Sequence, residues 1–243
     1  LVEEATYTVV QGETVLTTTA VDCYELTGLT AATSYPAGTF TIISDCDETL
    51  VANVPAFTTL CDDITALPWS EDFEGFDANT VPMCWDNSAS TSYISATSSS
   101  PNCIWGVVTV NDNKMIKMEN YWAQSGTALI NTPTIVLPAE GAYQLTFDYA
   151  HNATCGAFAV KVSTDNGTTF TELASYTQGS GTSHTEPGDF TPASISLTDY
   201  AGESIILQFF ANANYGNGAI FVDNVAVTEI EMPTLSMDIV GHK

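Results

Sequence analysis

The sequence contains no arginine, and its only basic side chains are four lysines, Lys114, Lys117, Lys161 and Lys243. Twenty-nine acidic residues outnumber them, so the formal net charge is −25. Nucleic acids and anionic membranes are bound through clustered cations, so we expect neither as a partner. The strongest apolar run, residues 205–210, is much shorter than the ~18 residues of a membrane-spanning helix, and we expect no membrane insertion.

Histidine is also scarce, with only His151, His184 and His242 in the chain. No G-x-S-x-G nucleophile motif occurs, and Asp148 lies three positions from His151, so the two would face opposite sides of a strand. No strand carries the paired carboxylates of a sandwich glycosidase. We therefore predict no catalytic residue, and we keep a glycoside hydrolase or peptidase-associated domain only as an alternative.

The six cysteines include no C-x-x-C pair, which disfavours zinc sites and thioredoxin-type redox chemistry. Their even number fits disulfides formed in an oxidising compartment, with buried free thiols as the alternative. Because the chain begins at Leu1, without a methionine or a signal peptide, we expect a trimmed fragment of a larger exported protein, secreted or at the cell surface.

Short runs of Val, Ile, Thr, Tyr and Phe, broken by Gly, Pro, Asn and Ser, fill the 243 residues. This pattern predicts an all-β protein. We expect a small, possibly truncated Ig-like sandwich over residues 1–61, with strands at 5–10, 14–19, 23–26, 39–44 and 56–60. A connector over 62–67 would follow, then an antiparallel jelly-roll sandwich over 68–231 and a C-terminal tail or linker over 232–243.

Two family resemblances add to this interpretation. The stretch "CYELTGLTAATSYPAGTFTIISDC" with "FTTLC" resembles the second half of a fibronectin type III domain. The segments "LPWSEDFEGFDANTVPMCWDN", "YQLTFDYAHNATCGAFAVKVSTDNGTTFTEL" and "SIILQFFANANYGNGAIFVDNVAVTEI" resemble, in order, the MAM and cleaved-adhesin jelly-roll families of bacterial surface proteins. That resemblance implies a non-catalytic adhesion or glycan-binding module.

One candidate site is a cation site. Asp223 lies inside an apolar strand, and a chain so poor in basic residues is expected to balance such a carboxylate with a bound cation. The resemblance implies a structural calcium between the first and last strands, held by Glu74 and Asp223. Strand alternation would place Asp72 on the face of Glu74, and Asn224 replaces the second acid of the family's usual pair. The alternative is that both acids only cap turns or accept backbone hydrogen bonds.

A second candidate site is built from aromatic side chains in Asn-, Ser- and Gly-rich turns, where recognition residues are often found on sandwiches. Such rings can stack on sugars, although packing is the commoner role of each ring taken singly. His151, at the end of a strand, is a weaker candidate for the same ligand. The predicted ligand-binding residues are Trp105, Tyr121, Trp122, Tyr215 and His151.

Fifteen pairings of the cysteines are possible. Cys23 would begin one strand and Cys46 end the next, which predicts a bridge between them. The MAM resemblance implies a bridge from Cys61 to Cys84, which leaves Cys103 with Cys155. The motif "STDNGTTF" matches an Asp box, which we interpret as a hairpin-forming device and not as a sign of sialidase activity.

The favoured function is a non-catalytic, calcium-stabilised adhesion or carbohydrate-binding module of a larger extracellular protein. Its partner would be a glycan or a host or cell-surface protein, together with other domains of the same polypeptide. The alternative is an architectural or protein-interaction module without a sugar site.

Overall fold

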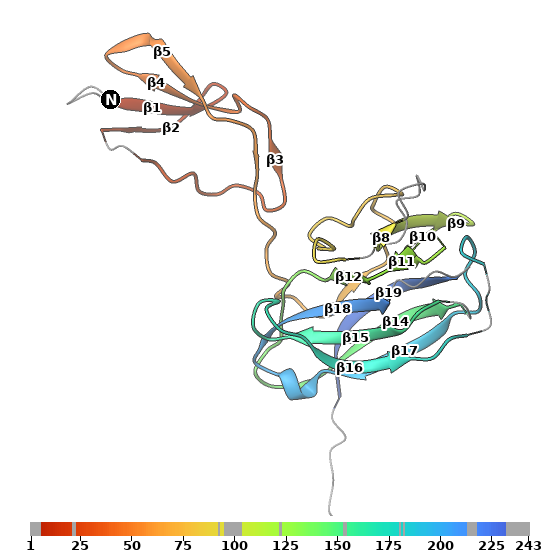
Figure 1. Cartoon of the computed structure of the whole chain (residues 1–243). Coiled ribbons are helices and arrows are strands. Elements are labelled where there is room, and N and C mark those ends of the chain that lie inside the picture. Colours follow the sequence, from red (N-terminus) through yellow and green to blue (C-terminus); the bar gives the residue numbers. More distant parts are fainter. Residues whose placement is uncertain are drawn as a thin grey trace, which may run out of the picture. The chain divides into compact units, whose positions relative to one another are not determined.

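The structure, a computed structural model, describes residues 6–20, 23–91, 93–94, 104–121, 123–152, 155–179, 181, 183–212 and 218–231. The chain forms two compact units, residues 1–62 and 63–243, so the division falls inside the expected connector (Figure 1). The expected tail over 232–243 lies outside the described residues. Among the described residues, no helix is long and apolar enough to cross a membrane.

The smaller unit is a four-stranded antiparallel sheet in the order β2-β1-β4-β5, with a separate two-stranded ribbon of β3 and β6. Its core is small: among the described residues of this unit, Phe40 is the one aromatic ring that is fully buried, and it packs against the rings of Tyr35 and Phe57. The strands are β1 (Tyr7–Gln11), β2 (Thr14–Thr19), β3 (Ser34–Tyr35), β4 (Phe40–Ser44), β5 (Asp47–Asn53) and β6 (Phe57–Thr58).

One prediction for the smaller unit is wrong, because residues 23–26 form no strand. The segment Asp47–Asn53, to which the sequence analysis assigned no strand, pairs with β4 as β5. Pairing with a neighbour, which satisfies the backbone donors and acceptors, outweighs the weak strand propensity of Asp and Asn.

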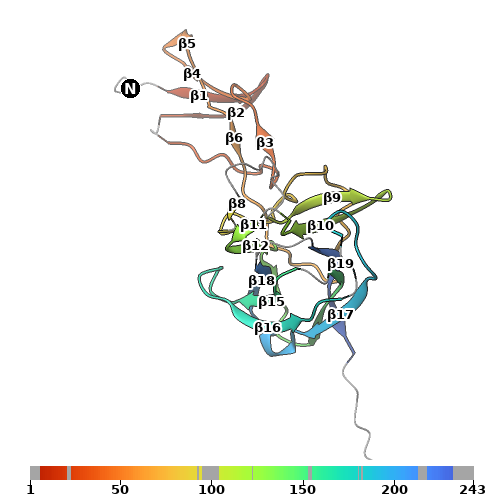
Figure 2. The same ribbon diagram turned by 45° about the vertical axis from the view of Figure 1, so that its right-hand side comes forward.

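The larger unit is a sandwich of two antiparallel sheets, as predicted (Figure 2). One sheet has the order β17-β14-β19-β10-β9, with β7 also paired to β19, and the other has the order β12-β18-β15-β16, with β13 also paired to β18. A short pair, β8 and β11, lies beside them, and a 3-10 turn (Thr198–Tyr200) precedes β18. The strands are β7 (Trp69–Glu71), β8 (Tyr93–Ile94), β9 (Gly106–Val110), β10 (Asn113–Glu119), β11 (Ala123–Ser125), β12 (Thr127–Asn131), β13 (Ile135–Val136), β14 (Ala142–His151), β15 (Phe158–Ser163), β16 (Thr171–Tyr176), β17 (Thr191–Ser196), β18 (Ser204–Asn212) and β19 (Ala219–Ile230).

Alternation along the strands fills the space between the two sheets. In β14, Leu145 and Phe147 point inward, and they meet Phe158 of β15 and Phe209 of β18 in one continuous hydrophobic core. Side chains on the other face of each strand therefore lie on one of the two outer faces of the sandwich. The candidate sites are on these outer faces.

A β-bulge interrupts this alternation in β19. Thr146 pairs with Ala226 and Asp148 pairs with Asp223, so β19 holds one more residue than β14 over this stretch. Asn224 takes up the extra length with a φ of 52°. Val222 and Val225 are consequently both in the core, while the two polar residues between them leave the core side of the sheet.

Candidate functional site

The bulge brings acidic side chains together where β7 lies beside β19. Asp223 is buried and accepts two hydrogen bonds. Asn113 Nδ2 donates to its Oδ2 atom at 2.8 Å, and the backbone N–H of Asn224 donates to its Oδ1 atom at 2.7 Å. Asn224 Nδ2 donates to Asp148 Oδ2 at 2.9 Å. Glu74 accepts a hydrogen bond from the backbone N–H of Lys114 at 2.8 Å, which holds it beside β10.

Burial raises the pKa of Asp223, and the carboxylates of Asp148 and Glu74 raise it further, although its two hydrogen bonds oppose the shift. Lys114 does not neutralise the group, because its Nζ atom donates to the backbone carbonyls of Glu74 and Phe76, at 3.0 and 2.6 Å. The junction is therefore a site of unbalanced negative charge with hard oxygen donors.

The structure brings Glu74, Asp223 and Asn224 into this junction, but it does not bring Asp72. Phe73 has a φ of 60°, which ends the extended backbone after Glu71 and removes the alternation on which the prediction for Asp72 depended. The Asp72 carboxylate is exposed and accepts a hydrogen bond from the backbone N–H of Glu74 at 3.1 Å. Asp148, which sequence reasoning did not assign to this site, takes its place through the register of β14 with β19.

The donor chemistry of the junction suits calcium, which prefers carboxylate and amide oxygens. The geometry is less complete: among the residues that the structure describes, no three acidic, histidine or cysteine side chains converge closely enough to hold a metal ion as they stand. Glu74, Asp148 and Asp223, with the Asn224 side chain, are the residues that would hold the ion.

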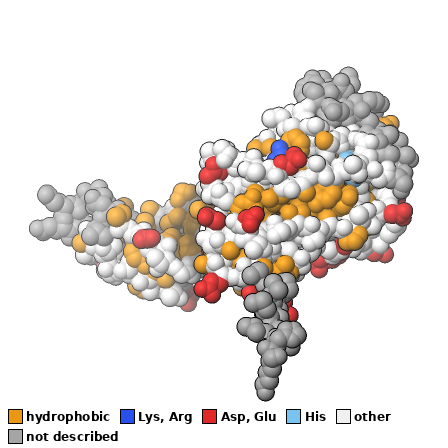
Figure 3. Space-filling view, turned by 90° about the horizontal axis from the view of Figure 1, so that it is seen from below, with side chains coloured by type: hydrophobic (Ala, Val, Ile, Leu, Met, Phe, Trp, Pro, Cys, Tyr) orange, Lys and Arg blue, Asp and Glu red, His pale blue; other side chains and the backbone are white. Residues whose placement is uncertain are grey.

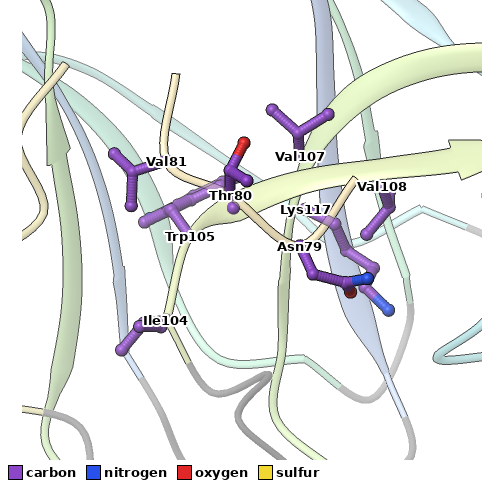
Figure 4. Close-up of a pocket in the computed structure, with 9 residues that line it drawn as sticks. Asn79, Thr80, Val81, Ile104, Trp105, Val107, Val108 and Lys117 are labelled. Atoms are coloured by element: carbon purple, nitrogen blue, oxygen red, sulfur yellow. The ribbon is translucent and has the colours of Figure 1, made fainter. Parts of the chain in front are cut away.

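The prediction that Trp105 binds a ligand is wrong. Its ring is fully buried against Phe158 and Phe209, and its Nε1 atom donates to the carbonyl of Ala128 at 3.2 Å. The hollow beside it holds about 90 Å³, much less than the roughly 300 Å³ of a small ligand cleft (Figure 4). An indole that packs in the core and satisfies its own donor is a structural residue.

His151 is also misassigned as a ligand residue, because it is only 3% exposed. Its Nε2 atom lies 2.7 Å from the carbonyl of Gly156, and its ring packs edge-on against Phe158. Burial lowers the pKa of His151, so the ring is neutral at physiological pH. Nδ1 is buried without a hydrogen-bond partner in the part of the chain that the structure describes.

Of the remaining predicted aromatics, Tyr121 is half-buried and stacks on His184 with the ring centroids 4.2 Å apart. Trp122 and Tyr215 lie outside the described residues.

Cys61 and Cys84 form a disulfide, as the resemblance implied. The other two predicted bridges are wrong, because Cys23, Cys46 and Cys155 are free thiols. Strand β1 separates β2, which precedes Cys23, from β4, which precedes Cys46. Burial raises the pKa of Cys155 to about 12 and keeps it protonated, while Cys103 lies outside the described residues.

The outer face of the sheet β17-β14-β19-β10-β9, which we call the covered face, carries a buried ion pair. Lys117 Nζ and Glu119 Oε2 are 2.7 Å apart, with side chains only 10% and 4% exposed. Lys117 also donates to the carbonyl of His184, in the segment between β16 and β17. Both charges are matched by protein groups.

The outer face of the sheet β12-β18-β15-β16, which we call the open face, holds a groove of about 540 Å³. Its floor combines aromatic, amide and charged side chains from three strands, and its borders come from the segment after Trp85 and from the Asp-box hairpin. The sequence analysis did not predict this groove, because it considered aromatic residues in turns, whereas Phe210 lies within strand β18. The lining includes Asp86, Leu129, Asn131, Lys161, Asn166, Gly167, Phe170, Ile206, Gln208 and Phe210.

Comparison with known proteins finds no matching family model and no matching curated protein. Among solved structures, the chain is similar to the K1 cleaved adhesin domain of Lys-gingipain from Porphyromonas gingivalis W83, with 17% identity, a TM-score of 0.47 and coverage of 68% of this chain and 100% of that one. It is also similar to the K3 domain of the same protein, with 18% identity, a TM-score of 0.46 and coverage of 66% and 97%. A third structure, CsCBM6-3 from Clostridium stercorarium in complex with cellobiose, has 19% identity, a TM-score of 0.37 and coverage of 70% and 98%.

Proposed function

We propose that the larger unit is a non-catalytic adhesion or carbohydrate-binding module of an exported protein, stabilised by a calcium ion at the junction of Glu74, Asp148 and Asp223. The observation that carries the proposal is the groove on the open face, whose mixed aromatic and amide lining is typical of ligand sites. Its partner would be a glycan, free or on a cell-surface protein.

The groups available for catalysis support a binding role. Glycoside hydrolysis needs two carboxyl groups about 5–10 Å apart, and Asp86 is the only acidic residue among the described residues that line the groove. His151 is neutral and faces the core, whereas Asp148 is on the opposite side of β14. Asp86, His151 and Asp148 therefore do not form a catalytic group among the described residues.

A glycan array, run with calcium and with chelator, tests the proposed function. We expect specific binding without turnover of the bound oligosaccharide. Silence across the array would contradict carbohydrate binding and favour the architectural alternative. Release of shortened products, abolished by replacing one carboxylate, would contradict the non-catalytic role.

Thermal melting tests the calcium. An ion that binds only the folded state stabilises it by mass action, about 2.7 kcal/mol at a hundredfold excess over the dissociation constant. Chelator should lower the melting temperature of the wild-type protein, and Asp223→Asn should abolish the difference. Asp72→Asn is the matched control and should retain it, because Asp72 lies outside the junction. A melting curve unchanged by chelator would contradict the calcium site.

A further inference from the structure

The register of the strands arranges the open face in rows. Asn131 of β12 pairs with Gln208 of β18, Gln208 pairs with Lys161 of β15, and Lys161 pairs with Glu172 of β16. Directly paired residues point to the same face of a sheet. The side chains of Asn131, Gln208 and Lys161 therefore form one polar row on the floor of the groove, and Glu172 lies next to Lys161 on β16, outside the lining of the groove.

Apolar side chains lie on both sides of this polar row. On one side, Leu129 pairs with Phe210, and both are half-buried. On the other side are Ile206 and Phe170, also half-buried. The groove thus offers two apolar strips separated by a line of hydrogen-bonding groups.

Both borders of the groove are fixed by hydrogen bonds. On the β12 side, the backbones of Asp86 and Asn131 exchange two hydrogen bonds, of 3.0 and 2.8 Å. On the other side, Asn166 and Gly167 both have positive φ angles at the hairpin tip, which Asp165 holds by accepting from the backbone N–H of Thr169 at 2.8 Å. The groove is therefore preorganised, which lowers the entropic cost of binding.

Lys161 is the exception among the described lysines. The ammonium groups of Lys114 and Lys117 donate to protein oxygens, whereas that of Lys161 lies over the Phe210 ring, 3.7 Å from its centroid, with no hydrogen bond or ion pair to the described residues. Asn131 likewise uses its Oδ1 atom, which accepts from Gln208 Nε2 at 3.0 Å, and leaves its Nδ2 atom unused within the described residues. Donors remain available on the floor of the groove.

We infer that the groove on the open face binds a neutral oligosaccharide, whose apolar C–H groups pack against Leu129 and the part of Phe210 that Lys161 leaves uncovered, while its hydroxyl groups bond to Lys161 and Asn131. This inference rests on the proposed function and names its ligand class and residues. A sugar combines an apolar ring face with dense hydroxyl groups, which matches the alternating strips. An anionic sugar is disfavoured by the net charge of −25 and by Asp86 and Glu172 near Lys161.

The test uses the whole chain and an array of neutral and acidic oligosaccharides, followed by titration calorimetry with the best neutral binder. We expect Phe210→Ala to weaken binding about tenfold or more, because the apolar contact of this side chain with the sugar is lost. Lys161→Met and Asn131→Ala should each weaken it several-fold, because each removes a hydrogen-bond donor and leaves the strip of Leu129 and Phe210 in place. Tyr121→Ala, which changes one of the aromatic residues indicated by the sequence and lies outside the groove lining, is the matched control and should bind like the wild type.

Melting curves check that each variant is folded. If Phe210→Ala does not fold, Lys161→Met still tests the groove. Wild-type binding to a neutral glycan that all three groove variants retain would overturn this inference and leave the proposed function standing. Binding of acidic glycans or of peptides alone would overturn the assigned ligand class. A wild-type protein silent on the array would overturn the proposed function, and this inference with it.

Discussion

The two outer faces of the larger unit are made of similar alternating strands, yet each uses its lysine differently. On the covered face, Lys117 is 9% exposed and pairs with Glu119, two residues further along β10. On the open face, Lys161 is half-buried, lies over Phe210 and forms no ion pair with the described residues. The ammonium group of Lys117 is therefore bound by protein groups, whereas that of Lys161 is available to a ligand.

The segment between β16 and β17 accounts for the difference. The carbonyl of His184 accepts from Lys117, and the buried Asn152 side chain binds backbone groups of Ser183 and Glu186 in the same segment. On the open face, the borders leave a groove over Lys161. A polar side chain on an outer strand face is thus structural where a loop closes over it and available for binding where none does. Acidic groups are much more abundant than basic ones on the surface drawn in Figure 3, so an available lysine is uncommon.

The largest expected effect comes from removing the covered lysine. Lys117→Met leaves the Glu119 carboxylate buried without its cation, which should lower the free energy of unfolding by about 3–5 kcal/mol. Lys161→Met, the matched change on the open face, should alter it by less than about 0.5 kcal/mol. Urea unfolding of the two variants measures both values.

The double variant Lys117→Met with Glu119→Leu serves as the control, because replacing both charges leaves no buried carboxylate without its counter-ion and should recover most of the lost stability. If Lys117→Met and Lys161→Met lowered the free energy of unfolding equally, the proposed difference between the covered face and the open face would be wrong.

A smaller effect is expected from His151, which faces the core and packs against Phe158. Burial lowers its pKa in the folded state below the ordinary 6.5, so the unfolded state binds a proton more readily. The stability that the neutral His151 ring contributes is therefore complete above pH 6.5, and it is lost as the pH falls from 6.5 through the lowered pKa of the folded state. Urea unfolding between about pH 7.5 and 5.5 gives the free energy of unfolding at each pH. This free energy should fall with decreasing pH in the wild type and fall less steeply in His151→Gln. An unchanged slope in that variant would show that other groups cause it.

The smallest effect is expected at the Asp-box hairpin that borders the open face. Hydrogen bonds from Thr169 and Ser163 lower the pKa of Asp165 to about 2 from an ordinary 3.8. Its contribution is therefore present above pH 3.8 and lost as the pH falls toward 2. Asp165→Asn should melt slightly below the wild type at neutral pH, with the difference closing in acid. The exposed Asp189→Asn is the control, and a difference that persisted near pH 2 would contradict the assignment.

The sequence predicted the all-β class and the sandwich correctly, because the alternation of apolar residues in β14, β15 and β18 is visible in it. The hairpin at Asn166 and Gly167 was also predictable, since few residue pairs adopt two positive φ angles. The strand β5 was not, because its pairing with β4 depends on the rest of the sheet.

The candidate site was predicted less well, for reasons of register. Glu74 and Asp223 were brought together as expected, but Asp72 was misplaced by the turn at Phe73, and Asp148 reached the junction only through its pairing with β19. Trp105 was selected as an aromatic residue in a turn, but its ring is buried in the core. The row of Asn131, Gln208 and Lys161 depends on the register of three strands, which the sequence does not show. Asn131, Lys161 and Gln208 lie at least thirty positions apart in the sequence.

The extra residue in β19 serves the polar junction and not the core. Deleting Asn224 would remove the bulge and restore a strict two-residue period. Val222 and Val225 would then be two positions apart and would both still point into the core, whereas the hydrogen bond from Asn224 to Asp148 would be lost. A shorter strand would therefore keep its packing and lose the arrangement of polar groups that the insertion creates.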